Sequence, residues 1–181
     1  MCSSDLILPP ALGAEDLVFS RSADHSRVLA FSVSAGALGV FDSTSDSFGP
    51  VQNISVSAAA LSPNGSQVAV LEASPAVPGG NQVVLFDSQF DTLATYQFNA
   101  QSGAGGLIFS RDGSSLYVFA GGTVVVLHAS DLSLAGVVPS SANVGAGYPP
   151  DVDENGDDFY SRRGPTQRLL CRCERTLRAG H

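Results

Sequence analysis

Residues 151–157 are the part of this chain best suited to chemistry. The segment has Asp at its first and third positions, Asn at its fifth and Gly at its sixth, which is the first half of a calcium-binding loop. Such a loop also needs a bidentate Glu at its twelfth position, where this chain has Arg162. The segment also aligns with two others that lack these ligands. We therefore interpret Asp151, Asp153 and Asn155 as part of a hairpin turn rather than as a calcium site.

Three further polar residues hold equivalent places in a repeated phrase. Asp42 follows Val-Phe, Asp87 follows Leu-Phe 45 residues later, and His128 takes that place another 41 residues on. These side chains would form an active site only if they met at one end of a channel. The alternative is that each Asp accepts hydrogen bonds from the turn after its strand, which is the interpretation that we favour.

The sequence predicts no nucleophilic centre. His25 lies in a turn, and no Ser-His-Asp order or glycine-flanked nucleophile accompanies it. Ser20, Ser62 and Ser110 recur at one place in the repeat, so none of them stands out as a catalytic residue. We accordingly predict no catalytic and no cofactor-binding residues, and no cofactor.

The three cysteines, Cys2, Cys171 and Cys173, lie outside the repeats. Cys171 and Cys173 form a Cys-x-Cys pair, whereas structural zinc sites typically use Cys-x-x-Cys spacing and two further ligands. His181 is close in sequence but terminal. These residues predict neither a metal site nor a disulfide framework.

The elements that must position these residues form a tandem repeat. The anchor residues of one phrase are Ser20, Ser62, Ser110 and Asp153, at spacings of 42, 48 and 43 residues. The phrase that contains Asp42 and Asp87 keeps the same step. Two independent phrases with one period indicate duplication, and a period near 40–45 residues is the length of a four-stranded β-propeller blade.

Each repeat unit reads as four short strands. In the third unit these are 106–110, 116–120, 123–127 and 134–138, separated by turns that contain Gly or Asp and ended by Pro139. Runs such as 83–86 are apolar without alternation, which predicts burial of both faces and therefore a neighbouring blade on each side.

Turn residues separate the strands. Asn64-Gly65 and Asp112-Gly113 predict two-residue hairpin loops, since both residue types tolerate positive φ. Asp24-His25 predicts a looser turn in the first unit. The Pro- and Gly-rich insertion at 74–81 predicts an exposed loop between the second and third strands of its unit.

The opening of these units resembles a known family. The segment 109–118 reads Phe-Ser-Arg-Asp-Gly-Ser-Ser-Leu-Tyr-Val, and 61–66 reads Leu-Ser-Pro-Asn-Gly-Ser. Both are similar to the blade opening of YVTN-type, WD-repeat-like bacterial β-propellers, and 123–127 stands where that family has its next strand. The Tyr-Val-Thr-Asn tetrapeptide and the Trp-Asp mark are absent. The resemblance implies an architecture and transfers no catalytic residue.

The predicted fold is all-β: a partial β-propeller of consecutive four-stranded antiparallel blades, with about three full blades and part of a fourth, roughly 3.5 in all. The expected units are 14–56, 57–102, 103–146 and a partial 147–160, which together form a repeat segment over 14–160. The alternative is a small ring closed by an incomplete fourth blade.

Both ends of the sequence differ from the repeats. We expect 1–13 to be a non-native or disordered head, because 1–6 match a sequencing-library adapter read as codons. Six of the nine Arg follow residue 161, on a chain whose net charge is −8. We interpret the basic tail, 161–181, as out of frame or disordered. A functional basic arm is the further alternative.

The composition limits the possible partners. The acidic repeat segment has only three Arg and no Lys, which argues against nucleic acid. No apolar run reaches the length of a membrane span. The leading function is a non-catalytic binding or scaffold surface in an exported bacterial protein, extracellular or periplasmic. Its blade loops would bind a protein or carbohydrate, and further blades would complete the ring. The alternative is part of a propeller enzyme, such as a lactonase, dehydrogenase or hydrolase.

Overall fold

The computed structural model describes residues 8–13, 16–73, 76, 80–98, 104–120, 122–139, 151–152, 158–163 and 166–172 of the chain. Within these ranges the protein is built of β-strands, with one 3-10 turn, η1 (Pro10–Leu12). Three consecutive antiparallel sheets have five, four and four strands, and the fourth strand of the first is split into β4 and β5.

The first blade contains β1 (Leu17–Arg21), β2 (Arg27–Ser32), β3 (Ala37–Asp42), β4 (Ser47–Phe48) and β5 (Gln52–Asn53). The second contains β6 (Ala58–Leu61), β7 (Gln67–Ala73), β8 (Asn81–Asp87) and β9 (Thr92–Gln97). The third contains β10 (Ala104–Phe109), β11 (Ser115–Ala120), β12 (Thr123–His128) and β13 (Leu134–Pro139). A further sheet contains β14 (Asp151–Val152), β15 (Asp158–Arg163) and β16 (Thr166–Arg172).

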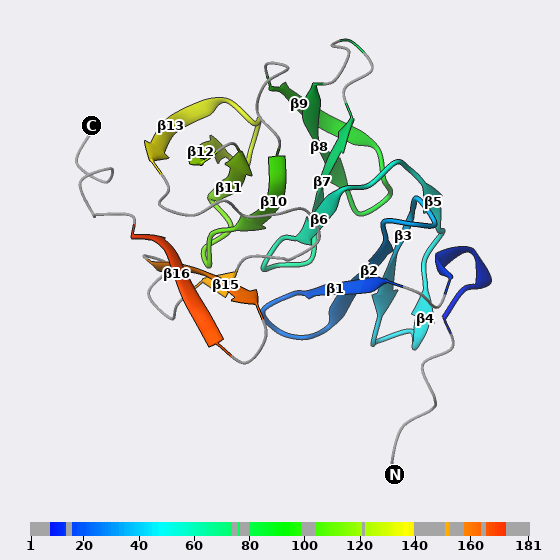
Figure 1. Ribbon diagram of the computed structural model, residues 1–181. Helices are drawn as coiled ribbons and strands as arrows, with labels where there is room; N and C mark the ends of the chain where they lie inside the picture. The colour runs from blue at the N-terminus through cyan, green and yellow to red at the C-terminus, as the bar shows by residue number, and fades with distance from the viewer. Residues whose placement is uncertain are drawn as a thin grey trace.

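Each sheet is antiparallel, and strands pair in sequence order except β5, which pairs with β3 as β4 does. The first strands of successive blades are neighbours, β1 beside β6 and β6 beside β10. Figure 1 shows these first strands toward the middle of the molecule and β4, β9 and β13 toward its outside. The fold is thus a row of similar sheets turned about a common centre.

Alternation along the middle strands of the second blade explains why the blades pack together. In β7, Val68 and Val70 belong to a core shared with the first blade, whereas Leu71 belongs to a core shared with the third. In β8, Val84 faces the first of these cores and Leu85 the second. Successive side chains of a strand point to opposite faces, so a run of apolar residues fills both cores. This confirms the prediction that these strands are buried on both faces.

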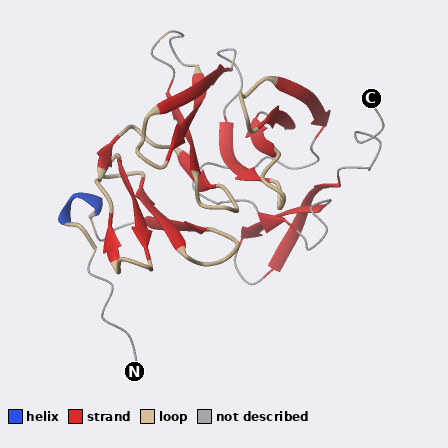
Figure 2. Ribbon diagram, turned by 180° about the vertical axis from the view of Figure 1, so that it is seen from behind, coloured by secondary structure: helices blue, strands red, loops and turns tan. Residues whose placement is uncertain are grey.

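The far face of the first blade is covered by residues near the N-terminus. Leu12 is fully buried and packs with Ala30 and Ala37 in a small third core. Figure 2 shows η1 at the side of this blade. The structure therefore differs from the expected disordered head, because the described residues 8–13 supply apolar cover that a neighbouring blade supplies elsewhere.

The opposite end also differs from the expected boundary at residue 160. β15 continues to Arg163, and β16 pairs with it in antiparallel register, with Arg163 opposite Thr166. The physical reason is the Gly-Pro break at 164–165, which separates two runs that can pair as a hairpin. Of the arginines of the basic tail, Arg162, Arg163, Arg168 and Arg172 lie in these strands, as does Cys171.

The fourth strand of the first blade is interrupted. β4 and β5 both pair with β3, and 49–51 separates them. Pro50 has no N–H to donate to a ladder, while the Gly49 N–H still donates to the Val40 carbonyl at 2.9 Å. The outer edge of this blade is consequently short and bent.

Candidate functional site

One end of the blades gathers most of the polar turns of the protein. In an up-and-down sheet, the loop between strands one and two and the loop between strands three and four lie at the same end. We call this end the turn face. Its loops are 22–26, 43–46, 62–66, 88–91, 110–114 and 129–133. Backbone hydrogen bonds tie neighbouring loops together: Ser43 N–H donates to Ser26 O at 2.8 Å, and Ala129 N–H to Ser114 O at 3.0 Å.

The loops between strands one and two have four residues, not the predicted two. In the second blade, Ser62 N–H donates to Gln67 O at 2.9 Å and closes the loop 63–66. Gly65 N–H then donates to Ser62 O at 2.8 Å. Only the Gly of each Asn-Gly or Asp-Gly pair has positive φ, +70° at Gly65 and +73° at Gly113.

The Asn or Asp before that glycine organises the turn with its side chain. Asn64 Oδ1 accepts hydrogen bonds from Ser62 Oγ (2.8 Å), Ser66 N (3.0 Å) and Ser66 Oγ (2.8 Å). Ser62 Oγ in turn accepts the Gln67 N–H at 2.9 Å. Asp112 repeats the pattern with Ser110 and Ser114 in the third blade.

The first blade has the same turn, centred on Asp24. Asp24 Oδ1 accepts hydrogen bonds from Ser22 Oγ (2.6 Å), Ser26 N (3.0 Å) and Ser26 Oγ (2.8 Å). The structural counterpart of Ser62 and Ser110 is therefore Ser22, and the alignment of Ser20 with them is wrong by two residues. Ser20 instead joins blades, because its Oγ accepts the Leu61 N–H at 3.1 Å.

The turn at His25 is closed by the same hydrogen bond as the others. His25 takes the place of glycine with φ +60°, and its N–H donates to Ser22 O at 3.1 Å. The predicted looser turn thus keeps the common conformation. Histidine there is held in the left-handed region, which L side chains rarely adopt.

These hydrogen bonds stabilise the ionised carboxylates. The Ser22 hydroxyl, with the backbone and hydroxyl of Ser26, lowers the pKa of Asp24 to about 2 from an ordinary 3.8. The Ser110 hydroxyl, followed by Ser114, lowers the pKa of Asp112. Donors aimed at a carboxylate favour its charged form, so both groups serve as fixed acceptors in their turns.

Asp42 and Asp87 also bind the turns that follow their strands, as favoured from the sequence. Asp42 Oδ1 accepts the Thr44 N–H at 2.8 Å, and this bond lowers the pKa of Asp42. Asp87 Oδ1 accepts the N–H groups of Gln89 and Asp91, each at 2.9 Å.

The third residue of that set, His128, is exposed at the end of β12. In the described ranges no hydrogen bond or ion pair joins any two of Asp42, Asp87 and His128. The sequence-predicted candidates are therefore not brought together. Asp151 lies in β14, whereas Asp153 and Asn155 lie outside the described residues, so the hairpin-turn interpretation of this segment stays a prediction.

Arg27 fastens the first blade to the second. Its Nη1 donates to Gly65 O at 3.0 Å, and its Nε lies 3.5 Å from Asp42 Oδ2. Beside it, Ala23 N–H donates to Pro63 O at 2.7 Å. Both groups of the ion pair are about one-third exposed, so we assign Arg27 an orienting role between turns rather than a large stabilising energy.

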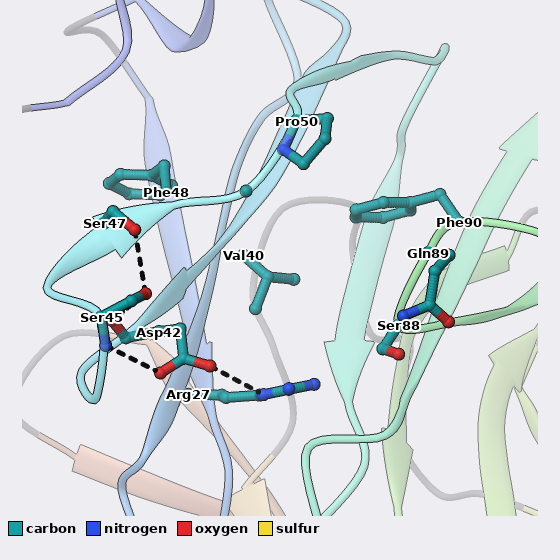
Figure 3. Close-up of a pocket in the computed structure, with 11 residues that line it drawn as sticks. Arg27, Val40, Asp42, Ser45, Ser47, Phe48, Pro50, Ser88, Gln89 and Phe90 are labelled. Atoms are coloured by element: carbon teal, nitrogen blue, oxygen red, sulfur yellow. Dashed lines mark hydrogen bonds and ion pairs between the residues drawn. The ribbon is translucent and has the colours of Figure 1, made fainter.

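A cleft with a volume of ≈ 250 Å³ opens beside this ion pair, between the first two blades. Its apolar lining is Val40, Phe48, Pro50 and Phe90, and its polar end is Arg27 with Asp42. Figure 3 shows Phe48 and Phe90 on opposite sides of the cleft, Val40 between them and the ion pair at one end. We call this feature the interblade cleft.

Sequence reasoning did not find the interblade cleft, because its two walls come from turns of different blades. Phe48 follows the loop 43–46, and Phe90 lies in the loop 88–91. The only local signal was Gly49-Pro50, which separates β4 from β5. No cluster of three or more potential metal ligands occurs among the described residues. No helix in the described part of the chain is long and apolar enough to cross a bilayer.

Comparisons with solved structures identify the fold. The chain superposes on hydrazine synthase of Kuenenia stuttgartiensis with a TM-score of 0.60 and 16% identity, over 79% of this chain and 40% of that one. It superposes on the β-propeller domain of Cps50 (Swd1) of Myceliophthora thermophila with a TM-score of 0.62 and 13% identity, over 80% and 49%. No family model and no curated protein matches the sequence.

The chain thus spans less than half the length of either structure, and at this identity the likeness concerns the fold alone. Together with the consecutive four-stranded antiparallel sheets, it confirms the predicted fold class. The chain consists of consecutive blades of a β-propeller.

Proposed function

We propose that these blades form a non-catalytic binding surface, and that the turn face binds a protein partner. The observation that carries the proposal is that hydrogen bonds hold the aspartates in their ionised form. Five described aspartates have a lowered pKa because neighbouring hydroxyl or backbone groups donate to them: Asp16, Asp24, Asp42, Asp112 and Asp131. A general acid at neutral pH needs the opposite shift. These groups instead hold their loops in fixed shapes, which favours binding without folding of the loops.

The charge of the turn face supports a protein partner with basic residues. Five aspartates lie in its loops, and two more end the strands that lead into them: Asp24, Asp46, Asp91, Asp112 and Asp131 in the loops, Asp42 and Asp87 at the strand ends. Its arginines are Arg21, at the end of β1, Arg27 and Arg111. An acidic surface of this kind attracts cationic partners and repels nucleic acid.

A selection experiment tests the proposal. A phage-displayed peptide library is panned on the immobilised chain, and the recovered peptides are tested on two variants of exposed turn-face residues, Thr44→Arg and Ser130→Arg. The control variant is Ala35→Arg, in the exposed loop 33–36 at the other end of the first blade. We expect at least one turn-face variant to abolish binding while the control keeps it. Peptides whose binding is abolished only by Ala35→Arg would show that the binding surface lies at the opposite end of the blades, which would refute the proposal.

A carboxyl titration separates binding from catalysis. We expect Asp24, Asp42, Asp112 and Asp131 to titrate below the ordinary value of 3.8 when followed by NMR, because hydrogen bonds lower the pKa of each. A turn-face aspartate that titrates near neutral pH would favour the enzyme alternative, since catalytic acids are tuned in that direction.

We extend the proposal to an exported bacterial protein. Its support is compositional: no Lys occurs in the chain, and no Cys lies between Cys2 and Cys171. Immunoblotting of medium, periplasm and cytoplasm from the source cells tests it. Protein confined to the cytoplasm would refute the exported location and leave the binding surface in place.

A further inference from the structure

The interblade cleft has walls that are built before any ligand arrives. Phe48 packs against Phe41 with ring centroids 5.4 Å apart, and Phe90 packs against Phe86 at 6.1 Å. Phe86 and Val84 belong to the core between the two blades, which Val40 and Phe90 extend to the surface. Each wall is thus supported by a second aromatic ring, at separations typical of stable aromatic pairs.

The backbone conformation of Phe90 is one that other residue types adopt more easily. Its φ is +64°, and its N–H donates to Asp87 O at 3.2 Å to close the loop. Asn or Gly would adopt this backbone more easily than a bulky aromatic side chain. Phe90 therefore places a partly buried ring against the cleft despite an unfavourable backbone conformation.

The size of the cleft selects the kind of ligand. Its volume of ≈ 250 Å³ is below the roughly 300–1,000 Å³ of ordinary small-molecule sites. The lining combines apolar walls with polar side chains, among them Ser45, Ser47 and Gln89. A slot of this size, open at the surface, suits a single side chain of a peptide better than a whole cofactor. Its apolar walls favour an aromatic or large aliphatic side chain.

The rim of the cleft carries negative charge. Asp46 lies between the lining residues Ser45 and Ser47, while Asp87 and Asp91 flank the lining residues 88–90. Arg27 is the only cation of the lining, and its charge is matched by Asp42. A ligand with positive charges on both sides of its apolar side chain is complementary to this rim.

We propose that the interblade cleft binds an extended peptide segment of a partner protein, with one large apolar side chain in the slot and Lys or Arg on either side of it. This inference rests on the proposed function, because it names the partner chemistry of one part of the turn face. The apolar side chain supplies the anchor, and the flanking cations supply charge complementarity with Asp46, Asp87 and Asp91.

The test measures fluorescence anisotropy with a labelled Lys-Lys-Phe-Lys-Lys peptide and two controls, Lys-Lys-Ala-Lys-Lys and Glu-Glu-Phe-Glu-Glu. Loss of the buried apolar side chain should weaken binding about tenfold. Reversal of the charges should weaken it by a similar factor, more at low salt than at high salt. Equal binding of the Ala peptide, equal binding of the Glu peptide, or no saturable binding of the Phe peptide would each overturn the proposal.

Gly49→Leu tests the place of binding. A Cβ at Gly49, which lines the cleft, meets only Val40 O at 3.6 Å, an ordinary contact. Gly49 has no left-handed φ, so a side chain can be added at this lining position without backbone strain and should obstruct the cleft. We expect about tenfold weaker binding of the Phe peptide and an unchanged melting temperature. Phe90→Asn, which suits the positive φ, removes one wall and should have the same effect on binding.

Charge variants complete the design. Asp46→Asn with Asp91→Asn removes two rim charges and keeps residues that tolerate these turns. We expect the salt dependence of binding to decrease. Peptide binding that is unaffected by Gly49→Leu and by Phe90→Asn would overturn the cleft site. The proposed function would still stand if Ser130→Arg, in the third blade, abolished the binding of library-selected peptides.

Discussion

Substitution of Gly65 by Ala is the sharpest test of how the blades are joined. Gly65 has φ +70°, and an added Cβ would lie 2.9 Å from Arg27 Cδ and 3.4 Å from Arg27 Cβ. The first of these distances is shorter than real Cβ contacts allow. Arg27 cannot simply swing away, since its guanidinium binds Gly65 O and Asp42.

The expected magnitude has two parts. The left-handed conformation costs an alanine about 1–2 kcal/mol, of which roughly 0.4–1 kcal/mol is offset by the lower entropy of the unfolded chain. Displacement of Arg27 sacrifices a hydrogen bond to Gly65 O, which adds about 1 kcal/mol. We expect Gly65→Ala to destabilise the protein by about 2 kcal/mol in total.

Two other glycines provide matched controls. Gly113 has φ +73°, and its added Cβ would meet Pro63 Cδ at an ordinary 3.5 Å. Gly122 has φ +81° with nothing within 4 Å. Both controls lack the collision, so we expect Gly113→Ala and Gly122→Ala to cost only about 1 kcal/mol each.

Urea unfolding followed by circular dichroism measures the three differences. With a slope of roughly 2 kcal/mol per molar urea, Gly65→Ala should lower the midpoint by about 1 M and each control by about half as much. Arg27→Ala should remove the excess cost of Gly65→Ala in a double-mutant cycle. Equal destabilisation by Gly65→Ala and Gly113→Ala would refute the view that Arg27 is held in place between the blades.

Three further predictions concern the loops between strands one and two of the blades, in which two serines bind a central Asp or Asn. His25→Gly should raise stability by about 0.5 kcal/mol, because it relieves a left-handed residue; a lower melting temperature would show that the imidazole is stabilising there. Asp24 has a pKa of about 2 in the folded protein against an ordinary 3.8. Its contribution to the free energy of unfolding is therefore present above pH 4 and is lost as the pH falls toward 2. Thermal melts of Asp24→Asn should therefore show a flatter decline over that range, and an unchanged acid limb would contradict this. Ser62, which is 2% exposed, accepts the Gln67 N–H, so Ser62→Ala should cost about 1–3 kcal/mol in urea unfolding; a neutral effect would mean that water replaces the hydroxyl.

The fold was predictable because it depends on periodic apolar runs. The run 83–86 is apolar without alternation, which predicts that both faces of the strand are buried. The structure agrees, because Val83 lies in one core and Val84 in the other. The repeat period then sets the number of strands in a unit. These are local properties of the sequence.

The turn conformation was harder to predict, because it depends on side-chain hydrogen bonds. Asn64-Gly65 is compatible with a two-residue loop, but the serines on either side, Ser62 and Ser66, both bind Asn64 Oδ1 and set a four-residue loop. The spacing Ser-x-Asp-x-Ser is the signal that was missed. It would have aligned Ser22, not Ser20, with Ser62.

The candidate site depends on contacts between blades, and single-sequence patterns do not report those. Val40 and Phe90 come from different blades, and each reads as an ordinary strand or turn residue. The cover that Leu12 provides for the first blade was missed for the same reason. Only tertiary packing reveals either feature.

The self-contained turn has a consequence for how such a protein can grow. Ser62 and Ser66 both bind Asn64, so the conformation of this turn is set largely by residues of its own hairpin. A duplicated gene segment would therefore encode a hairpin with the same turn conformation. Later mutations could then adjust the contacts of that hairpin with the neighbouring blades. His25 stands where the other two turns have glycine, and Asn64 where the other two have Asp, so one turn conformation accommodates different residues at these two places.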